Sequence, residues 1–189
     1  PRDDVLEVRR QILELCRDEG WLREGADLMD GLTDHEPIQE AVDAWKPMYQ
    51  RLQALEDFHK LKRHEDVRHL MEDLFEEPVV PLPMTISRVA FPRDNDNGTQ
   101  PHQDWIYVRG SMSIISCWGT LGDVPLEVGG LKLLAESHKA GLLTPKPAPG
   151  PGGNIVAVDP DLEWHQSDYR AGDLLLFTPL TVHAAAENH

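Results

Sequence analysis

The chain has 189 residues, 33 of them acidic and 18 basic, and its formal charge is −15. This length is sufficient for one domain with a sizeable hydrophobic core. A chain with this negative charge repels phosphate backbones, so nucleic acid is not expected as a partner. No apolar run approaches the roughly 20 residues of a membrane-spanning helix, so a membrane is not expected as a partner either. The two cysteines, Cys16 and Cys117, form no CxxC pair, which favours a reducing, cytoplasmic setting.

The first 77 residues follow a helical period. Three amphipathic helices are predicted, and their approximate ranges are 5–16, 37–55 and 60–75. Asp3 or Asp4 is expected to cap the first helix, and Gly20 to end it. Pro47 is expected to kink the second helix.

From residue 78 onward, short apolar runs alternate with Pro and Gly, a pattern typical of an all-β sandwich or barrel. The predicted strands span 84–91, 105–108, 112–118, 131–134, 155–158, 173–177 and 181–185. Residues 144–153 are too rich in Pro and Gly for regular structure, so a mobile loop is expected there. The predicted organisation is a single domain over 1–189, with a mainly helical flank at 1–77 and a β core at 78–189.

Two His-x-Asp patterns invite a metal hypothesis, and backbone geometry distinguishes them. His64 and Asp66 lie in a predicted helix, where residues two apart point in nearly opposite directions, so His64 is interpreted as a surface histidine. His102 and Asp104 lie where the pattern changes to strand, and residues two apart in a strand share a face. His183, after the apolar strand 173–177, is the natural third ligand.

Two imidazoles and one carboxylate on one side of a metal leave positions open for other ligands. This arrangement is typical of Fe(II) sites that bind a co-substrate and O₂. A structural zinc site is normally closed by four protein ligands, often including cysteine. Cys117 keeps zinc open as an alternative at this point.

Three ordered stretches, Thr99–Trp105, Val128–Lys139 and Tyr169–His183, resemble the phytanoyl-CoA dioxygenase family. In that order, the three stretches are similar to the family's iron-binding strand, to its Ser-His turn segment and to its strand that ends at a distal histidine. The helical opening at Val8–Leu22 is also similar. The resemblance implies a double-stranded β-helix (a jelly-roll, cupin-like core) with an N-terminal helical section, and a site for Fe(II), 2-oxoglutarate and O₂.

The resemblance also implies roles for individual residues. It assigns three of them to the iron: His102, Asp104 and His183. Trp118 matches a strand tryptophan near the co-substrate, although a core tryptophan explains it equally well. Gln103 and Gln100 flank the ligands, where each either faces the co-substrate or is a strand-edge residue.

A basic residue is expected to bind the far carboxylate of 2-oxoglutarate. In the family this residue follows the distal histidine, so the full-length protein is expected to continue past His189 with another strand that carries Arg or, as second choice, Lys. The alternative is that Arg88 or Arg109 performs this task, and Arg88 is taken as the candidate within the chain.

The expected activity is hydroxylation of a small organic metabolite, with release of succinate and CO₂. Asp104 favours hydroxylation over halogenation, because halogenating relatives replace this carboxylate with a small residue. The helical section and the 144–153 loop are expected to cover the mouth of the barrel and to shape substrate choice. Two alternatives stay open: a non-catalytic jelly-roll binding protein, and a metal-dependent isomerase or hydrolase with the same ligands. A CoA ester, a natural product and an amino-acid derivative all remain compatible as substrates, and no oligomeric state is predicted.

Overall fold

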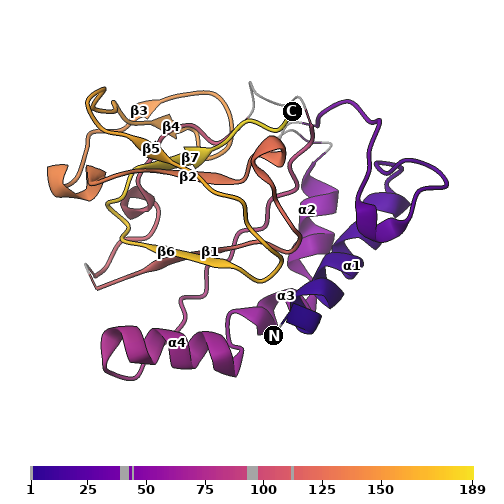
Figure 1. Cartoon of the computed structure of the whole chain (residues 1–189), viewed down its shortest axis with the longest axis horizontal. Helices are drawn as coiled ribbons and strands as arrows, with labels where there is room; N and C mark the ends of the chain where they lie inside the picture. The colour runs from indigo at the N-terminus through magenta and orange to yellow at the C-terminus, as the bar shows by residue number, and fades with distance from the viewer. Residues whose placement is uncertain (1, 39–42, 44, 93–97, 112) are drawn as a thin grey trace. The chain divides into compact units, whose positions relative to one another are not determined.

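The computed structural model describes residues 2–38, 43, 45–92, 98–111 and 113–189. The chain forms two compact units (Figure 1): a helical unit of Pro1–Glu36 with Asp43–Val89, and a sheet-rich unit of Pro37–Val42 with Ala90–His189. N-terminal helices followed by a sheet-rich part are what the sequence predicts. The division into a flank at 1–77 and a core at 78–189 stays a prediction. No helix within the described ranges combines the length and apolar character needed to cross a bilayer.

Helix α1 spans Arg2–Asp18 and has the predicted amphipathic pattern. Its buried residues recur at three- and four-residue steps: Val5, Val8, Ile12 and Cys16. Asp3 and Asp4 lie inside the first turn rather than at the cap, where their charges still favour the positive end of the helix dipole. Gly20 ends the helix as expected, with a φ of +74° and its N–H donating to the Arg17 carbonyl at 2.9 Å.

Helix α2 spans Lys46–Gln53, so it begins later than the predicted 37–55 helix. Pro47 lies in its first turn, where no intrahelical N–H is required, and the predicted kink is therefore wrong. The buried residues Met48 and Leu52 follow the predicted stripe, and Trp45 stacks on Trp21 with ring centroids 5.5 Å apart. Residues 39–42 and 44 of the predicted helix lie outside the described residues.

The third predicted helix, 60–75, is two helices, α3 at Glu56–Leu61 and α4 at Glu65–Phe75. His64 separates them as the N-cap of α4, where its Nδ1 accepts the Asp66 N–H at 3.2 Å. A side chain that bonds to a free backbone N–H starts a new helix at this point. The helical unit also contains the short 3₁₀ helix η1 at Leu28–Asp30.

Among its described residues, the sheet-rich unit has seven short strands in three sheets. Strand β1 (Ser116–Gly119) pairs with β6 (Leu174–Phe177), and β2 (Leu131–Leu134) lies between β5 (Trp164–His165) and β7 (His183–Ala185). A hairpin joins β3 (Lys146–Pro147) and β4 (Asn154–Ile155). Every pairing is antiparallel, and Figure 1 shows β1–β6 and β5–β2–β7 as separate layers of this unit.

Two predicted strands are absent from the described residues. Residues 84–91 form no helix or strand, and the expected strand at 105–108 is replaced by the 3₁₀ helix η2, Asp104–Ile106. The segment 105–108 contains Trp, Ile and Val, a composition typical of a strand. In the structure, however, the Tyr107 and Val108 N–H groups both donate to the Asp104 carbonyl and close a turn. Two further 3₁₀ helices, η3 (Leu126–Val128) and η4 (Ser137–Ala140), flank β2.

The Pro- and Gly-rich segment 144–153 is partly regular, so its prediction as an irregular loop is wrong in that respect. Lys146 and Pro147 pair with Asn154 and Ile155, and Ala148 N–H donates to the carbonyl of Gly153 at 3.1 Å. Proline fits here because the strand is short and at an edge, where a missing N–H is tolerated.

The strands of the layered sheets have two distinct faces. On one face of β2, Leu134 packs with Val156 and with Val182, the residue before β7, into a buried cluster. Within each sheet the register defines the other face, because side chains opposite each other in an antiparallel pair share a face. The faces of the two sheets meet where Phe177 of β6 contacts His183 of β7. The residues of these faces are Ser116, Trp118, Leu175, Phe177, Leu131, Leu133, His183 and Ala185, and we call this set the site face.

Truncation of Leu134 should test whether the packed face carries the stability of the unit. Leu134 is 1% exposed, so Leu134→Ala should lower the free energy of unfolding by about 2–5 kcal/mol through lost burial and a residual cavity. Urea denaturation provides the measurement. Leu142→Ala is the control, because Leu142 is 56% exposed. Equal losses in the two variants would contradict the assignment of this core.

Candidate metal centre

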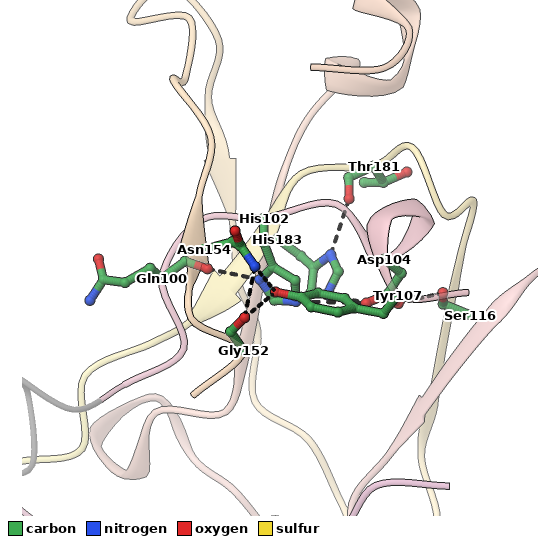
Figure 2. Close-up of polar contacts among 9 residues, drawn as sticks. All are labelled: Gln100, His102, Asp104, Tyr107, Ser116, Gly152, Asn154, Thr181 and His183. Atoms are coloured by element: carbon green, nitrogen blue, oxygen red, sulfur yellow. Dashed lines mark hydrogen bonds and ion pairs between the residues drawn. The ribbon is translucent and has the colours of Figure 1, made fainter. Parts of the chain in front are cut away.

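Three side chains converge on one point of the site face. His102, Asp104 and His183 each offer one donor atom, and these atoms lie within 4.8 Å of one another. The Oδ1 atom of Asp104 is 3.6 Å from His102 Nε2 and 3.5 Å from His183 Nε2 (Figure 2). Such spacing leaves room for one ion among the three donors. The structure therefore brings together the three residues that the sequence analysis selected as ligands.

The backbone explains why residues so distant in sequence meet. His102 and His183 form an isolated antiparallel bridge in which each N–H donates to the other residue's carbonyl at 3.0 Å. Gln103 is extended, with φ −116° and ψ 134°, so His102 and Asp104 point to the same side although Asp104 begins a 3₁₀ helix. The predicted strand at this position is wrong, but the shared orientation that it implied is present.

Both imidazoles are oriented by the same local hydrogen bond. His102 Nδ1 donates to the carbonyl of Gln100 at 2.8 Å, and His183 Nδ1 donates to the carbonyl of Thr181 at 3.0 Å. A carbonyl oxygen only accepts, so each Nδ1 carries a proton and each Nε2 is the ring nitrogen that faces the cluster. The rings lie 4.1 Å apart between centroids and are buried. This is the tautomer that metal coordination through Nε2 requires.

Asp104 is ionised and turned by a neighbour on another strand. Ser116 of β1 donates its hydroxyl to Asp104 Oδ2 at 2.6 Å, which leaves Oδ1 facing the two histidines. Burial opposes ionisation, but the contacts with His102 and His183 and the Ser116 hydrogen bond outweigh it and hold the pKa of the Asp104 carboxyl far below its usual range. Asp104 is therefore a carboxylate that offers one oxygen to an ion.

Gln103, between two of the ligands, has its amide bonded to the backbone. Its Nε2 donates to the carbonyls of Gly141 (2.9 Å) and Leu180 (2.7 Å), and its Oε1 accepts the N–H of Leu143 at 2.8 Å. The residue is fully buried. This geometry favours a structural role that fixes the turn before His183, and the predicted contact of Gln103 with a co-substrate stays a prediction.

The other two predicted co-substrate residues in this unit differ in orientation. The Gln100 side chain points away from the cluster in Figure 2, and its contribution is the carbonyl that orients His102. Trp118 shares the site face with Ser116, two residues earlier on β1, and packs edge-on against Tyr169 with centroids 5.0 Å apart. The position of Trp118 is compatible with both of its interpretations, and its contact with co-substrate stays a prediction.

Arg88 and His64 both belong to the helical unit. Arg88 is exposed, and its predicted role with 2-oxoglutarate stays a prediction. His64 is not part of the three-residue cluster, as predicted from its helical His-x-Asp spacing. It is expected on the surface of a helix, whereas in the structure it is the N-cap residue of α4.

Two serines that position the ligands are not among the predicted site residues. Ser116 donates a hydrogen bond to Asp104. Ser137 is buried and links β2 to Val182, the residue before His183. The Ser137 hydroxyl donates to the Leu134 carbonyl at 2.7 Å and accepts the Val182 N–H at 2.8 Å. The alternation of β1 places Ser116 on the same face as Trp118, but it carries no information about the contact with Asp104.

The donor set fits a metal that takes nitrogen and oxygen ligands and keeps positions open. Among the described residues, the cluster contains two imidazoles and one carboxylate but no thiolate. Cys117 points to the face of β1 opposite Ser116 and Trp118, because side chains alternate along a strand. The zinc–cysteine alternative therefore has no support from this geometry, and the set matches the facial arrangement of non-haem Fe(II) sites.

The chain belongs to the phytanoyl-CoA dioxygenase family, whose model matches residues 33–189. Among solved structures, the chain is similar to the epimerase SnoN in complex with Fe³⁺, alpha-ketoglutarate and nogalamycin RO. The two sequences are 20% identical, the match covers 96% of this chain and 68% of that chain, and the TM-score is 0.55. This likeness shows the fold and supports the predicted jelly-roll core. No curated protein matches the sequence.

Removal of the Ser116 hydroxyl should weaken metal binding without removing a ligand. Ser116→Ala leaves Asp104 Oδ2 without its donor, so the carboxylate is free to rotate, and we expect about 10- to 100-fold weaker binding of Co(II) or Fe(II). Titration followed by Co(II) absorption measures the change. Ser116→Thr should restore binding, and Ser113→Ala, at an exposed position, is the matched control. Wild-type affinity in Ser116→Ala would contradict this role.

Proposed function

We propose that this protein is an Fe(II)- and 2-oxoglutarate-dependent oxygenase that hydroxylates a small organic molecule. The observation that carries the proposal is the convergence of His102 Nε2, His183 Nε2 and Asp104 Oδ1, with both Nδ1 atoms engaged by backbone carbonyls. Membership of the phytanoyl-CoA dioxygenase family supports the same cofactors. SnoN, similar in fold, is named with iron and alpha-ketoglutarate in its complex.

The metal and co-substrate supply the oxidising chemistry when bound, using O₂ and converting 2-oxoglutarate to succinate and CO₂. The protein's own residues prepare the site for it. His102, Asp104 and His183 would hold the ion from one side and leave the other side to small ligands. Since a carboxylate that binds through one oxygen occupies one position only, the Ser116 bond to Oδ2 helps to keep those positions open.

The site face provides an apolar environment for the reaction. Phe177 packs against His183 with ring centroids 4.6 Å apart, and Leu133 is directly opposite His183 in the β2–β7 pair. Trp118 and Leu175 continue this surface on β1 and β6. Apolar walls exclude water and protect a reactive site from side reactions. The surface favours an organic substrate that presents a C–H bond to the metal.

The decisive experiment uses the metal-reconstituted protein without any organic substrate. Under anaerobic conditions, Fe(II) and 2-oxoglutarate should together produce the weak visible charge-transfer band of the chelate. Admission of O₂ should then yield succinate, which mass spectrometry quantifies. If the charge-transfer band forms but no succinate appears, the result favours a binding protein. If the protein binds the metal tightly but gives no charge-transfer band with 2-oxoglutarate, the result favours an isomerase or hydrolase.

The outcome at the substrate distinguishes hydroxylation from rearrangement. SnoN is an epimerase, so a family fold with iron is compatible with a product of unchanged mass. Candidate metabolites should be screened for products that gain one oxygen atom from ¹⁸O₂. A product with inverted stereochemistry and no gain of mass would replace hydroxylation with epimerisation while leaving the cofactor assignment intact.

Asp104→Ala should abolish O₂-dependent succinate formation and leave the fold in place. Loss of the carboxylate removes one ligand and the negative charge that offsets the ion, whereas the core is formed by Leu134, Val156 and Val182. Circular dichroism checks the fold. His64→Asn is the control, because Asn preserves an N-cap and the residue lies outside the cluster. Wild-type turnover in Asp104→Ala would contradict the assignment.

A further inference from the structure

Tyr107 lies against the metal cluster although no step described above involves it. It directly follows η2, and its N–H donates to the carbonyl of Asp104 at 2.9 Å. Its ring meets the His102 imidazole edge-on, with centroids 5.9 Å apart and planes at 67°. Tyr107 is therefore fixed to both ligands of the His-x-Asp pair, one through its backbone and one through its ring.

The hydroxyl of Tyr107 reaches a different part of the fold. It donates to the carbonyl of Gly152 at 2.8 Å, at the tip of the Pro- and Gly-rich hairpin (Figure 2). Asn154 Nδ2 donates to the same carbonyl at 2.9 Å and lies 3.4 Å from the Tyr107 hydroxyl. These three groups form a closed set of hydrogen bonds between the hairpin and the edge of the cluster.

Gly152 is the residue type that this contact requires. Its φ is +82°, a conformation that favours glycine, and a Cβ at this position would lie 2.7 Å from the Tyr107 hydroxyl oxygen. A side chain at this position would have to displace the phenol from its present place. The close approach of the two segments therefore depends on the pairing of Tyr107 with Gly152.

The tip itself, residues 148–153, has internal structure and a second tether. Gly153 N–H donates to the Gly150 carbonyl at 3.1 Å, and Ala148 N–H donates to Gly153. Beyond β4, Val156 N–H donates to the carbonyl of Pro101 at 2.8 Å, one residue before His102. The ligand-bearing segment thus holds the hairpin at two points, on either side of the His-x-Asp pair.

We propose that Tyr107 is a positioning residue whose hydroxyl holds the 148–153 tip as a wall beside the His102 side of the cluster. The wall limits how solvent and substrate reach the metal, and so contributes to the selection of small organic substrates. The part that concerns metal access rests on the proposed function, whereas the contact between Tyr107 and the tip does not.

Hydrogen exchange on the metal-free protein tests the contact. Tyr107→Phe removes only the hydroxyl and keeps the ring beside His102. A single hydrogen bond to a neutral carbonyl contributes modestly, so the Ala148 and Gly153 amides should exchange about 2- to 10-fold faster. Tyr49→Phe, which removes a phenol from the helical unit, should leave these amides unchanged. Equal exchange in Tyr107→Phe and wild type would overturn the contact.

Metal accessibility tests the wall. In Co(II)-loaded protein, Tyr107→Phe should leave the absorption spectrum unchanged, because the ligands are intact, while EDTA removes the metal several-fold faster. Removal at the wild-type rate would overturn the wall even if hydrogen exchange rises. A wild-type protein that binds no Co(II) would instead contradict the proposed function and the role of the wall in metal access, and hydrogen exchange alone would then decide the contact.

A double-mutant cycle isolates the pairing with Gly152. Gly152→Ala should open the tip by collision with the hydroxyl, and this effect should be smaller when combined with Tyr107→Phe, because the colliding atom is gone. The backbone strain that Ala causes at the positive φ of residue 152 is the same with Tyr107 and with Phe at position 107, so it cancels in the comparison. Additive effects on the exchange of Gly153 would show that the two residues act independently, and would overturn the proposal.

Discussion

The reciprocal backbone hydrogen bonds between His102 and His183 are the constraint on which the site depends. They join a segment that has no strand of its own to β7, and they bring together two ligands that are far apart in the chain. Side chains alternate between faces along an extended backbone, so a slip of one residue would replace His183 with Val182 or Ala184 at the cluster. Leu134 N–H, bonded to the carbonyl of Val182, helps to fix the register from the β2 side.

The ligands are oriented by hydrogen bonds within the protein itself. Each histidine donates Nδ1–H to the carbonyl two residues before it, so the extended backbone that places the ring also selects its tautomer. The carboxylate of Asp104 has no such local partner and depends on Ser116 from β1. A site whose donors are already positioned loses less conformational entropy on binding, which raises its affinity for the ion.

The sequence predicts those parts of the fold and site that depend on local backbone geometry. Helix α1 follows from side-chain periodicity and strand β2 from a short apolar run, and His102 with Asp104 follows from the extended conformation of a single residue between them. Ser116 could not be selected in this way, because its role arises from a contact between segments that only the folded chain brings together. Residues 105–108 illustrate the opposite error: apolar composition predicts a strand, but hydrogen bonds to the Asp104 carbonyl form a 3₁₀ turn.

The charge distribution on the site face explains why a cation is needed there. The eight strand positions of this face carry no lysine or arginine, and apart from His183 they are apolar or small. Asp104 is an ionised, partly buried carboxylate that faces the Nε2 atoms of two buried imidazoles, and such a set of donors favours a positive ion among the three side chains. A dianionic co-substrate bound against this face would meet positive charge at that ion. Its far carboxylate would need a basic group from outside the site face, because an unpaired buried charge is costly.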